Sequence, residues 1–101
     1  MHIQEIIEKH YMSQKERIKE LSEKLKYNVS FTDSYIGSIT YMFAKELFHE
    51  YESYIVRARA WLPDAEIDNK NIEKSLVTAE ELFKRAEEIK DILERFNYIR
   101  K

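Results

Sequence analysis

Apolar residues recur at spacings of three and four along the first quarter of the chain. Between residues 3 and 26 the stripe comprises Ile3, Ile7, Tyr11, Gln14, Ile18, Leu21 and Leu25, with Gln14 as its polar member. Such spacings place side chains on one face of an α-helix, and a stripe this narrow is typical of a coiled-coil seam. The pattern therefore predicts a helix over residues 3–26, ended by the turn-favouring residues that follow it.

A second helix is predicted over residues 33–62. Thr32 is the expected N-cap, because its hydroxyl can accept a hydrogen bond from the first turn. We expect Gly37 inside this helix, where it costs about 1 kcal/mol relative to alanine. Pro63 ends the helix, since the residue before a proline is disfavoured in the helical conformation.

A third helix is predicted over residues 69–97, with Asp68 as its N-cap. Its stripe has an average spacing of 3.5 residues, typical of supercoiled helices, and comprises Ser75, Ala79, Leu82, Ala86, Ile89, Leu93 and Phe96. Thr78 and Glu81 also form a capping-box pattern, which would break the helix near Val77 and Thr78. We favour a continuous helix, because apolar residues keep one face across the possible break.

The composition narrows the fold class. The chain of 101 residues contains one Gly, one Pro and no Cys, and 36% of its residues are charged. Few residues are therefore present that could interrupt a helix or crosslink the backbone. We expect one all-α domain over residues 1–101, an antiparallel three-helix bundle that associates into a larger helical assembly.

Charge and hydropathy limit the classes of partner. The chain has seventeen basic and nineteen acidic residues, its net charge is −2, and the two signs are interspersed along it. This balance gives no signal for nucleic acid or anionic lipid. No run approaches the roughly 18 apolar residues of a membrane span. We expect a cytoplasmic protein with neither a nucleic-acid nor a membrane partner.

The middle helix is too apolar to pack against a single neighbour. One face consists of Ile36, Phe43, Leu47, Tyr51, Tyr54, Ala58 and Trp61, and Ala44, Phe48, Ile55 and Leu62 extend it sideways. The combined arc spans about 140°, enough for two neighbouring helices and a free flank. The chain also has seven tyrosines, five phenylalanines and one tryptophan, more aromatic residues than a slim core absorbs.

These residues favour a role in protein binding, with the chain itself or another protein as the partner. Tyr51, Tyr54 and Trp61 are the expected aromatic anchors. Glu50 lies close to the apolar stripe, and Arg57 follows it two turns later, so we expect this pair to set the orientation of the partner.

A metal site is the main alternative. Glu46 and His49 stand three residues apart, which is half of the ligand set of ferritin-like di-iron bundles. With Glu50, and with a second copy across a symmetric dimer, they would form a di-metal carboxylate site. The helical wheel places Glu46 and His49 away from the apolar arc, however, so a solvated helix face is the favoured interpretation.

No catalytic group and no cofactor site is predicted from the remaining residues. The chain has no thiol, and one Gly cannot form a phosphate-binding loop. We therefore expect a small helical interaction module or accessory subunit without catalysis of its own. A small inhibitor or immunity protein that blocks a larger target is a further possibility.

Overall fold

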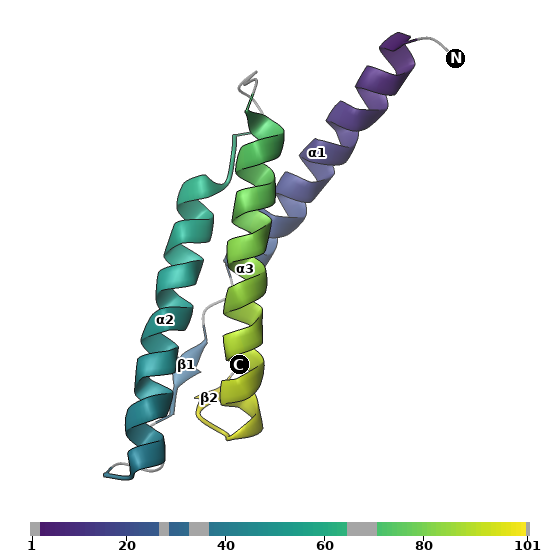
Figure 1. Cartoon of the computed structure of the whole chain (residues 1–101). Helices are drawn as coiled ribbons and strands as arrows, with labels where there is room; N and C mark the ends of the chain where they lie inside the picture. The colour runs from purple at the N-terminus through teal and green to yellow at the C-terminus, as the bar shows by residue number, and fades with distance from the viewer. Residues whose placement is uncertain (1–2, 27–28, 33–36, 65–70, 101) are drawn as a thin grey trace.

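The chain folds as an all-α bundle, as predicted. The computed structural model describes residues 3–26, 29–32, 37–64 and 71–100, and for residues 4–12 and 100 it describes the backbone alone. The described part contains the helices α1 (Ile3–Leu25), α2 (Ile39–Trp61) and α3 (Ile72–Arg95), and the two-residue strands β1 (Ser30–Phe31) and β2 (Ile99–Arg100). Successive helices alternate in direction (Figure 1).

The α2–α3 pair is the main packed unit of the fold. Leu76 and Leu93, both on α3, are its largest fully buried side chains. Ala58 on α2 and Ala79 and Ala86 on α3 have no exposed surface at all. Such small side chains allow two helix backbones to approach closely, which explains how a thin bundle can exclude water from its centre.

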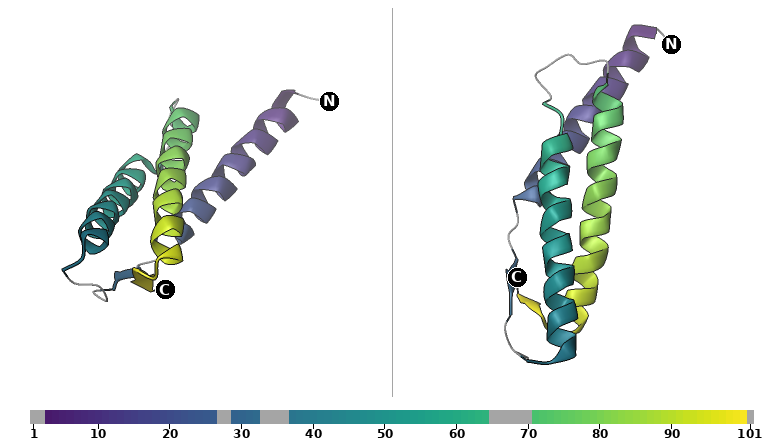
Figure 2. Two further views of the ribbon diagram at one scale, coloured as in Figure 1. Left: turned by 60° about the horizontal axis from the view of Figure 1, so that its bottom comes forward. Right: turned by 60° about the vertical axis from the view of Figure 1, so that its left-hand side comes forward.

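Helix α1 packs on this pair through its C-terminal half. Ile18, Leu21 and Leu25 are buried in the core, whereas Ile3 is 76% exposed. The N-terminal half of α1 leans away from the other two helices (Figures 1 and 2). The radius of gyration is therefore 17.4 Å, against about 13 Å for a compact domain of 100 residues.

Polar contacts fix α1 against the pair. The Arg17 guanidinium bridges Glu73, at 2.9 Å, and Glu80. Gln14, the polar member of the predicted seam, is buried and donates a hydrogen bond of 2.6 Å to Glu73. The hydrogen bond that Arg17 donates to Glu80, and to a smaller extent the one to Glu73, raises the pKa of the guanidinium. This cation therefore stays charged at every accessible pH.

Arg59 of α2 attaches to the other end of α1. Its Nε donates a hydrogen bond of 3.1 Å to the carbonyl oxygen of Leu25, the last residue of α1. The last carbonyls of a helix lack partners within the helix, and a cation there also interacts favourably with the helix dipole. The register between α1 and α2 is thereby fixed at their junction.

The predicted start of the second helix is wrong. Helix α2 begins at Ile39, and its N-cap is Ser38, whose Oγ accepts a hydrogen bond of 2.9 Å from the backbone N–H of Tyr41. The backbone N–H of Thr32 instead donates to the carbonyl of Tyr98 at 2.6 Å. Gly37 lies outside the helix with a φ of +92°, a left-handed conformation that only glycine adopts without strain.

A short antiparallel pairing explains this difference. Ser30 pairs with Arg100, and Phe31 pairs with Ile99. The Phe31 ring lies 5.3 Å from the ring of Phe48 and 5.8 Å from that of Tyr98. The pairing therefore keeps Ser30 and Phe31 extended, directly before Thr32, which the sequence predicts as the N-cap of the second helix. Strands of two residues are too short to show an alternating pattern.

The third helix is continuous, as the favoured interpretation predicted. Helix α3 runs from Ile72 to Arg95 through the possible break. The Thr78 hydroxyl, expected to cap a new helix in the alternative, donates instead to the carbonyl of Lys74 at 2.9 Å. The predicted N-cap Asp68 lies outside the described residues.

Asn97 ends α3 in a Schellman motif. Its φ is +61°, and its N–H donates to the Glu94 carbonyl at 3.1 Å. The N–H of Tyr98 donates to the Leu93 carbonyl at 2.9 Å, and the two side chains share a buried cluster. This pair of bonds with its hydrophobic contact is the usual helix stop, which turns the chain back toward β1.

Candidate protein-interaction face

The three predicted aromatic anchors occupy different environments. Tyr51 is buried, with 7% of its surface exposed, and belongs to the core. Tyr54 is half-buried at the edge of the core, and Trp61 is 49% exposed. Tyr51 therefore packs inside the monomer, contrary to our expectation of an exposed anchor, and only the other two can reach a partner.

Burial gives Tyr51 a pH dependence that can be measured. Desolvation, helped by the nearby Glu87 carboxylate, raises the pKa of its hydroxyl above the ordinary value of 10.0. The folded chain then keeps this proton at pH values where the unfolded chain loses it, so the free energy of unfolding falls as the pH rises above about 10. Urea unfolding between pH 8 and pH 11 should show this fall, and Tyr51→Phe should make it shallower. Equal pH profiles for the two proteins would contradict the assignment.

The predicted orienting charges both lie on the surface. Glu50, which the helical wheel placed close to the apolar stripe, is exposed. Arg57 is also exposed, and its guanidinium carbon lies 5.8 Å from the centre of the Tyr54 ring, a cation–π contact. Both charges therefore flank Tyr54 on α2 and are available to a partner.

The predicted metal ligands do not converge. Glu46, His49 and Glu50 are all exposed, and the Nδ1 atom of His49 lies 3.7 Å from a carboxylate oxygen of Glu52. Within the described part of the chain, no group of three or more His, Asp or Glu residues is placed to hold a metal ion. A di-metal site across a dimer stays a prediction.

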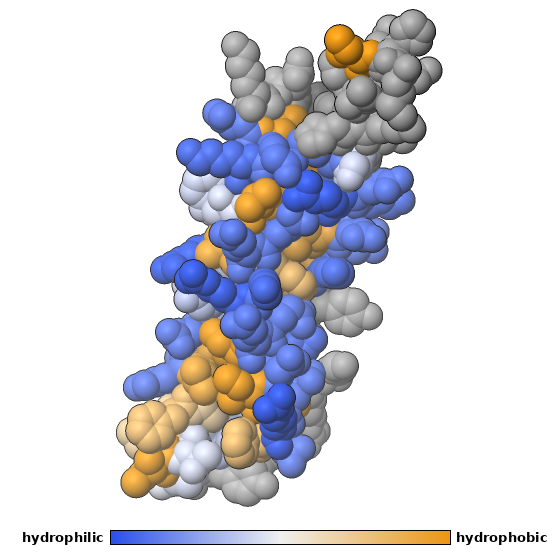
Figure 3. Space-filling view, turned by 45° about the vertical axis from the view of Figure 1, so that its right-hand side comes forward, coloured by the Kyte–Doolittle hydropathy of each residue, from blue (hydrophilic) through white to orange (hydrophobic). Residues whose placement is uncertain are grey.

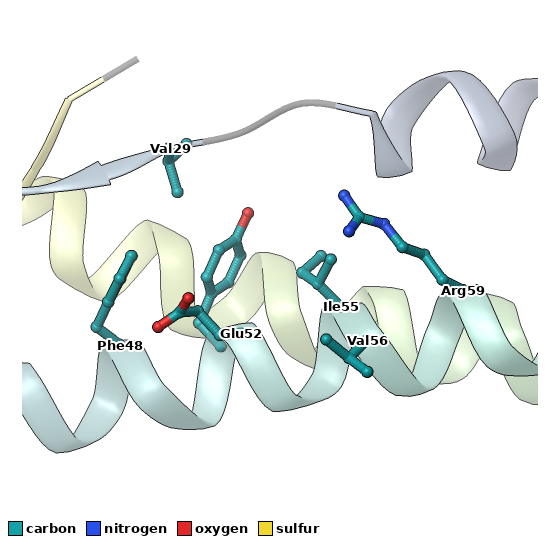
Figure 4. A pocket seen from close by; sticks show the side chains of 7 residues that line it. Val29, Phe48, Glu52, Ile55, Val56 and Arg59 are labelled. Atoms are coloured by element: carbon teal, nitrogen blue, oxygen red, sulfur yellow. The ribbon is translucent and has the colours of Figure 1, made fainter.

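A shallow pocket lies between α2 and the segment that follows α1. Its volume is about 100 Å³, and it is lined by Val29, Phe48, Tyr51, Glu52, Ile55, Val56 and Arg59. Figure 4 shows the Arg59 side chain directed toward the end of α1, where it donates to the carbonyl of Leu25. Ligand pockets usually measure about 300–1,000 Å³, so this one is too small for an organic cofactor.

A larger surface feature is an apolar face shared by α2 and α3, which we call the open face. We define it by Phe43, Leu47, Tyr54 and Trp61 of α2, by Leu82, Ile89 and Ile92 of α3, and by Phe96, the C-cap of α3. Four of them are strongly exposed, namely Phe43 at 62%, Phe96 at 59%, Trp61 at 49% and Ile92 at 42%. Figure 3 shows hydrophobic side chains gathered where α2 begins and α3 ends.

The open face lies on the side of the α2–α3 pair away from α1. Helix α1 contacts α2 through Arg59, and it contacts α3 through Glu73 and Glu80. At 100° per residue, these three positions fall on the opposite edges of their helices from the open-face residues. The two edges of α2 therefore differ, because α1 and β1 cover one edge and the other has no neighbouring element among the described residues.

Sequence reasoning missed the contribution of α3 to this face. Phe96 was assigned to the stripe of the third helix, where a core position is expected, and Ile92 was not singled out. A usable signal was present, because Ile89, Ile92 and Phe96 follow at spacings of three and four. These positions form a second apolar edge beside the buried residue Leu93.

Comparison with protein-family models, with curated proteins and with solved structures found no match. Among the described residues, no helix combines the length and the apolar character that crossing a membrane requires.

Proposed function

We propose that this protein is a helical protein-interaction module, without catalysis of its own, that binds another protein chain through the open face. The observation that carries this proposal is the gathering of half-exposed aromatic residues from two helices on one side of the bundle. Phe43, Trp61 and Phe96 each expose about half of their surface or more. Large aromatic side chains dominate the energetics of protein interfaces.

The surroundings of these aromatic residues also support a protein partner. Glu50 and Arg57 border the open face on α2, and Arg85 borders it on α3, and all three are exposed. An apolar centre with a charged rim is the usual anatomy of a protein interface. The cytoplasm is the proposed location, in keeping with a cysteine-free and charge-rich chain.

Photo-crosslinking tests the open face directly. The photoreactive residue p-benzoylphenylalanine would replace Phe43 or Phe96 in the cells that make the protein, and adducts would be identified by mass spectrometry. The matched control is Val56, which lies on the other edge of α2 and is exposed to the same 62% as Phe43. We expect protein adducts about tenfold more abundant from positions 43 and 96 than from position 56.

Adducts with a second copy of the chain and adducts with a different protein would both support an interaction module. The proposal fails if positions 43 and 96 yield no protein adduct, or if position 56 yields as much as they do.

A further inference from the structure

We propose that the occupant of the open face is a second copy of this chain. The two copies would be related by a two-fold axis parallel to α2 and α3, so that α2 of each copy packs on α3 of the other. The result is a four-helix core, with each α1 on the outside. This inference rests on the proposed function and names its partner.

The uneven distribution of apolar residues selects this axis. Phe43 lies near the start of α2 and Phe96 directly follows α3, so both lie at one end of the pair, and Ile92 is close by. A two-fold axis parallel to the helices brings these like ends together and places Phe43 of each copy opposite Phe96 of the other. An axis perpendicular to the helices would instead place these three residues against the opposite end of the second copy, where Trp61 is the single strongly exposed residue of the open face.

The charges bordering the open face match under the same axis. Ala44 of α2 and Leu93 of α3 share a buried cluster, and antiparallel helices advance equally from such a point, at about 1.5 Å per residue. Arg57 therefore lies at the level of Glu80, one residue from Glu81. Glu50 lies at the level of Glu87, within one turn of Arg85. In the two-fold pair, Glu50 would meet Arg85 of the second copy, and Arg57 would meet Glu81 of the second copy.

All four of these charged side chains are exposed in the monomer. Opposite charges at corresponding levels steer association and fix its register, whereas like charges there oppose it. An acidic and a basic residue border the open face on α2, and a basic and an acidic residue border it at the corresponding levels of α3. This order of charges favours the packing of α2 of one copy on α3 of the other. The open face is therefore complementary in charge to a second copy of itself, because both residues of each contact come from the same sequence.

The area of the face suits a stable dimer. An aromatic side chain buries about 150–250 Å², and Phe43, Trp61, Ile92 and Phe96 are about half exposed. Two copies would then bury roughly 600–800 Å² from these side chains. At the usual apolar share of about 60%, this corresponds to an interface of about 1,200 Å², the lower end of the range for specific complexes.

Sedimentation equilibrium of the purified protein is the first test. We expect a dimer whose dissociation constant rises about a hundredfold in Phe43→Glu, because the substitution places two charges in the apolar centre. Glu50→Arg and Arg85→Glu should each raise it about tenfold, since each brings like charges together twice. The control is Asp91→Arg, an exposed reversal on α3 at the angular position of Glu73, on the edge opposite the open face, which should leave the dissociation constant unchanged.

Mixing the two weakened chains gives the sharper test. A Glu50→Arg chain paired with an Arg85→Glu chain regains opposite charges at both contacts, whereas each variant paired with itself does not. We expect the mixture to form a heterodimer with nearly the affinity of the unmodified protein. Circular dichroism of each variant, with an unchanged helical spectrum, separates loss of pairing from loss of folding.

A monomer at micromolar concentrations would overturn this inference, as would a dimer unaffected by Phe43→Glu or a mixture that fails to recover affinity. The proposed function fails separately. If crosslinks from positions 43 and 96 join only a different protein, the interaction module stands and the second copy is excluded.

Discussion

Replacing Leu76 with alanine is expected to destabilise the fold by about 2–5 kcal/mol. Leu76 has no exposed surface and lies in the cluster where α1, α2 and α3 meet. The substitution removes three carbon atoms, and the surrounding helices can close only part of the cavity. Since small domains have a total stability of about 5–15 kcal/mol, thermal unfolding should shift downward by roughly 10–30 °C.

The neighbouring residue provides the matched control for this prediction. Val77 is 38% exposed on the same helix, and alanine has the higher helix propensity. Val77→Ala should therefore change the free energy of unfolding by less than about 0.5 kcal/mol. Similar losses from both substitutions, measured by urea unfolding, would mean that Leu76 is not at the centre of the core.

Enlarging Ala58 to leucine is expected to destabilise the fold by about 1–3 kcal/mol. Ala58 is fully buried on α2, in the same cluster as the fully buried Ala79 and Ala86 of α3. A longer side chain there has to separate the two helices or adopt a strained rotamer. Urea unfolding measures the loss, and the α-helical circular dichroism of the folded state should remain.

Ala60 offers the comparison, because it lies two residues away on the exposed side of the same helix. Ala60→Leu adds the same side chain in solvent and should shift the free energy of unfolding by less than about 0.5 kcal/mol. Close packing of α2 on α3 through their alanines would be refuted if the buried substitution were as well tolerated as the exposed one.

The helices themselves could be predicted from local patterns. The first was predicted over residues 3–26 and runs from Ile3 to Leu25, and the third is continuous, as favoured, although it is shorter than predicted at both ends. Helical periodicity depends on neighbours three and four residues apart, so it can be read directly from the sequence. The ends of a helix are harder to predict than its presence, because several residues near each end could serve as the cap.

The start of α2 shows why a local pattern can fail. Thr32 is a good N-cap by residue type, but its backbone N–H is bonded to Tyr98, which is far away along the chain. The helix begins at Ile39 instead, where Ser38 provides the capping oxygen. No pattern within the first forty residues could reveal this partner, because Tyr98 lies near the other end of the chain.

The residues predicted for the candidate site differ in their exposure. Trp61, Tyr54 and Arg57 do lie on or beside an exposed edge of α2, whereas Tyr51 belongs to the core. On a helical wheel Tyr51 and Tyr54 are only about 60° apart, and a sequence pattern does not tell which of two such neighbours faces the core. That distinction depends on the position of the adjacent helix.

The sequence by itself therefore determined the presence of three helices and the excess of apolar residues on the middle one. One Gly, one Pro and regular apolar stripes dictate helices through short-range interactions alone. Only the tertiary structure decided which edge of α2 is covered. The edge with Phe48 and Arg59 meets β1 and α1, because β1 pairs with the end of the chain and Arg59 binds the last carbonyl of α1. The edge with Phe43 and Trp61 has no neighbouring element in the part of the chain that the structure describes. Because both edges carry apolar residues, the sequence could not show which of them would be covered.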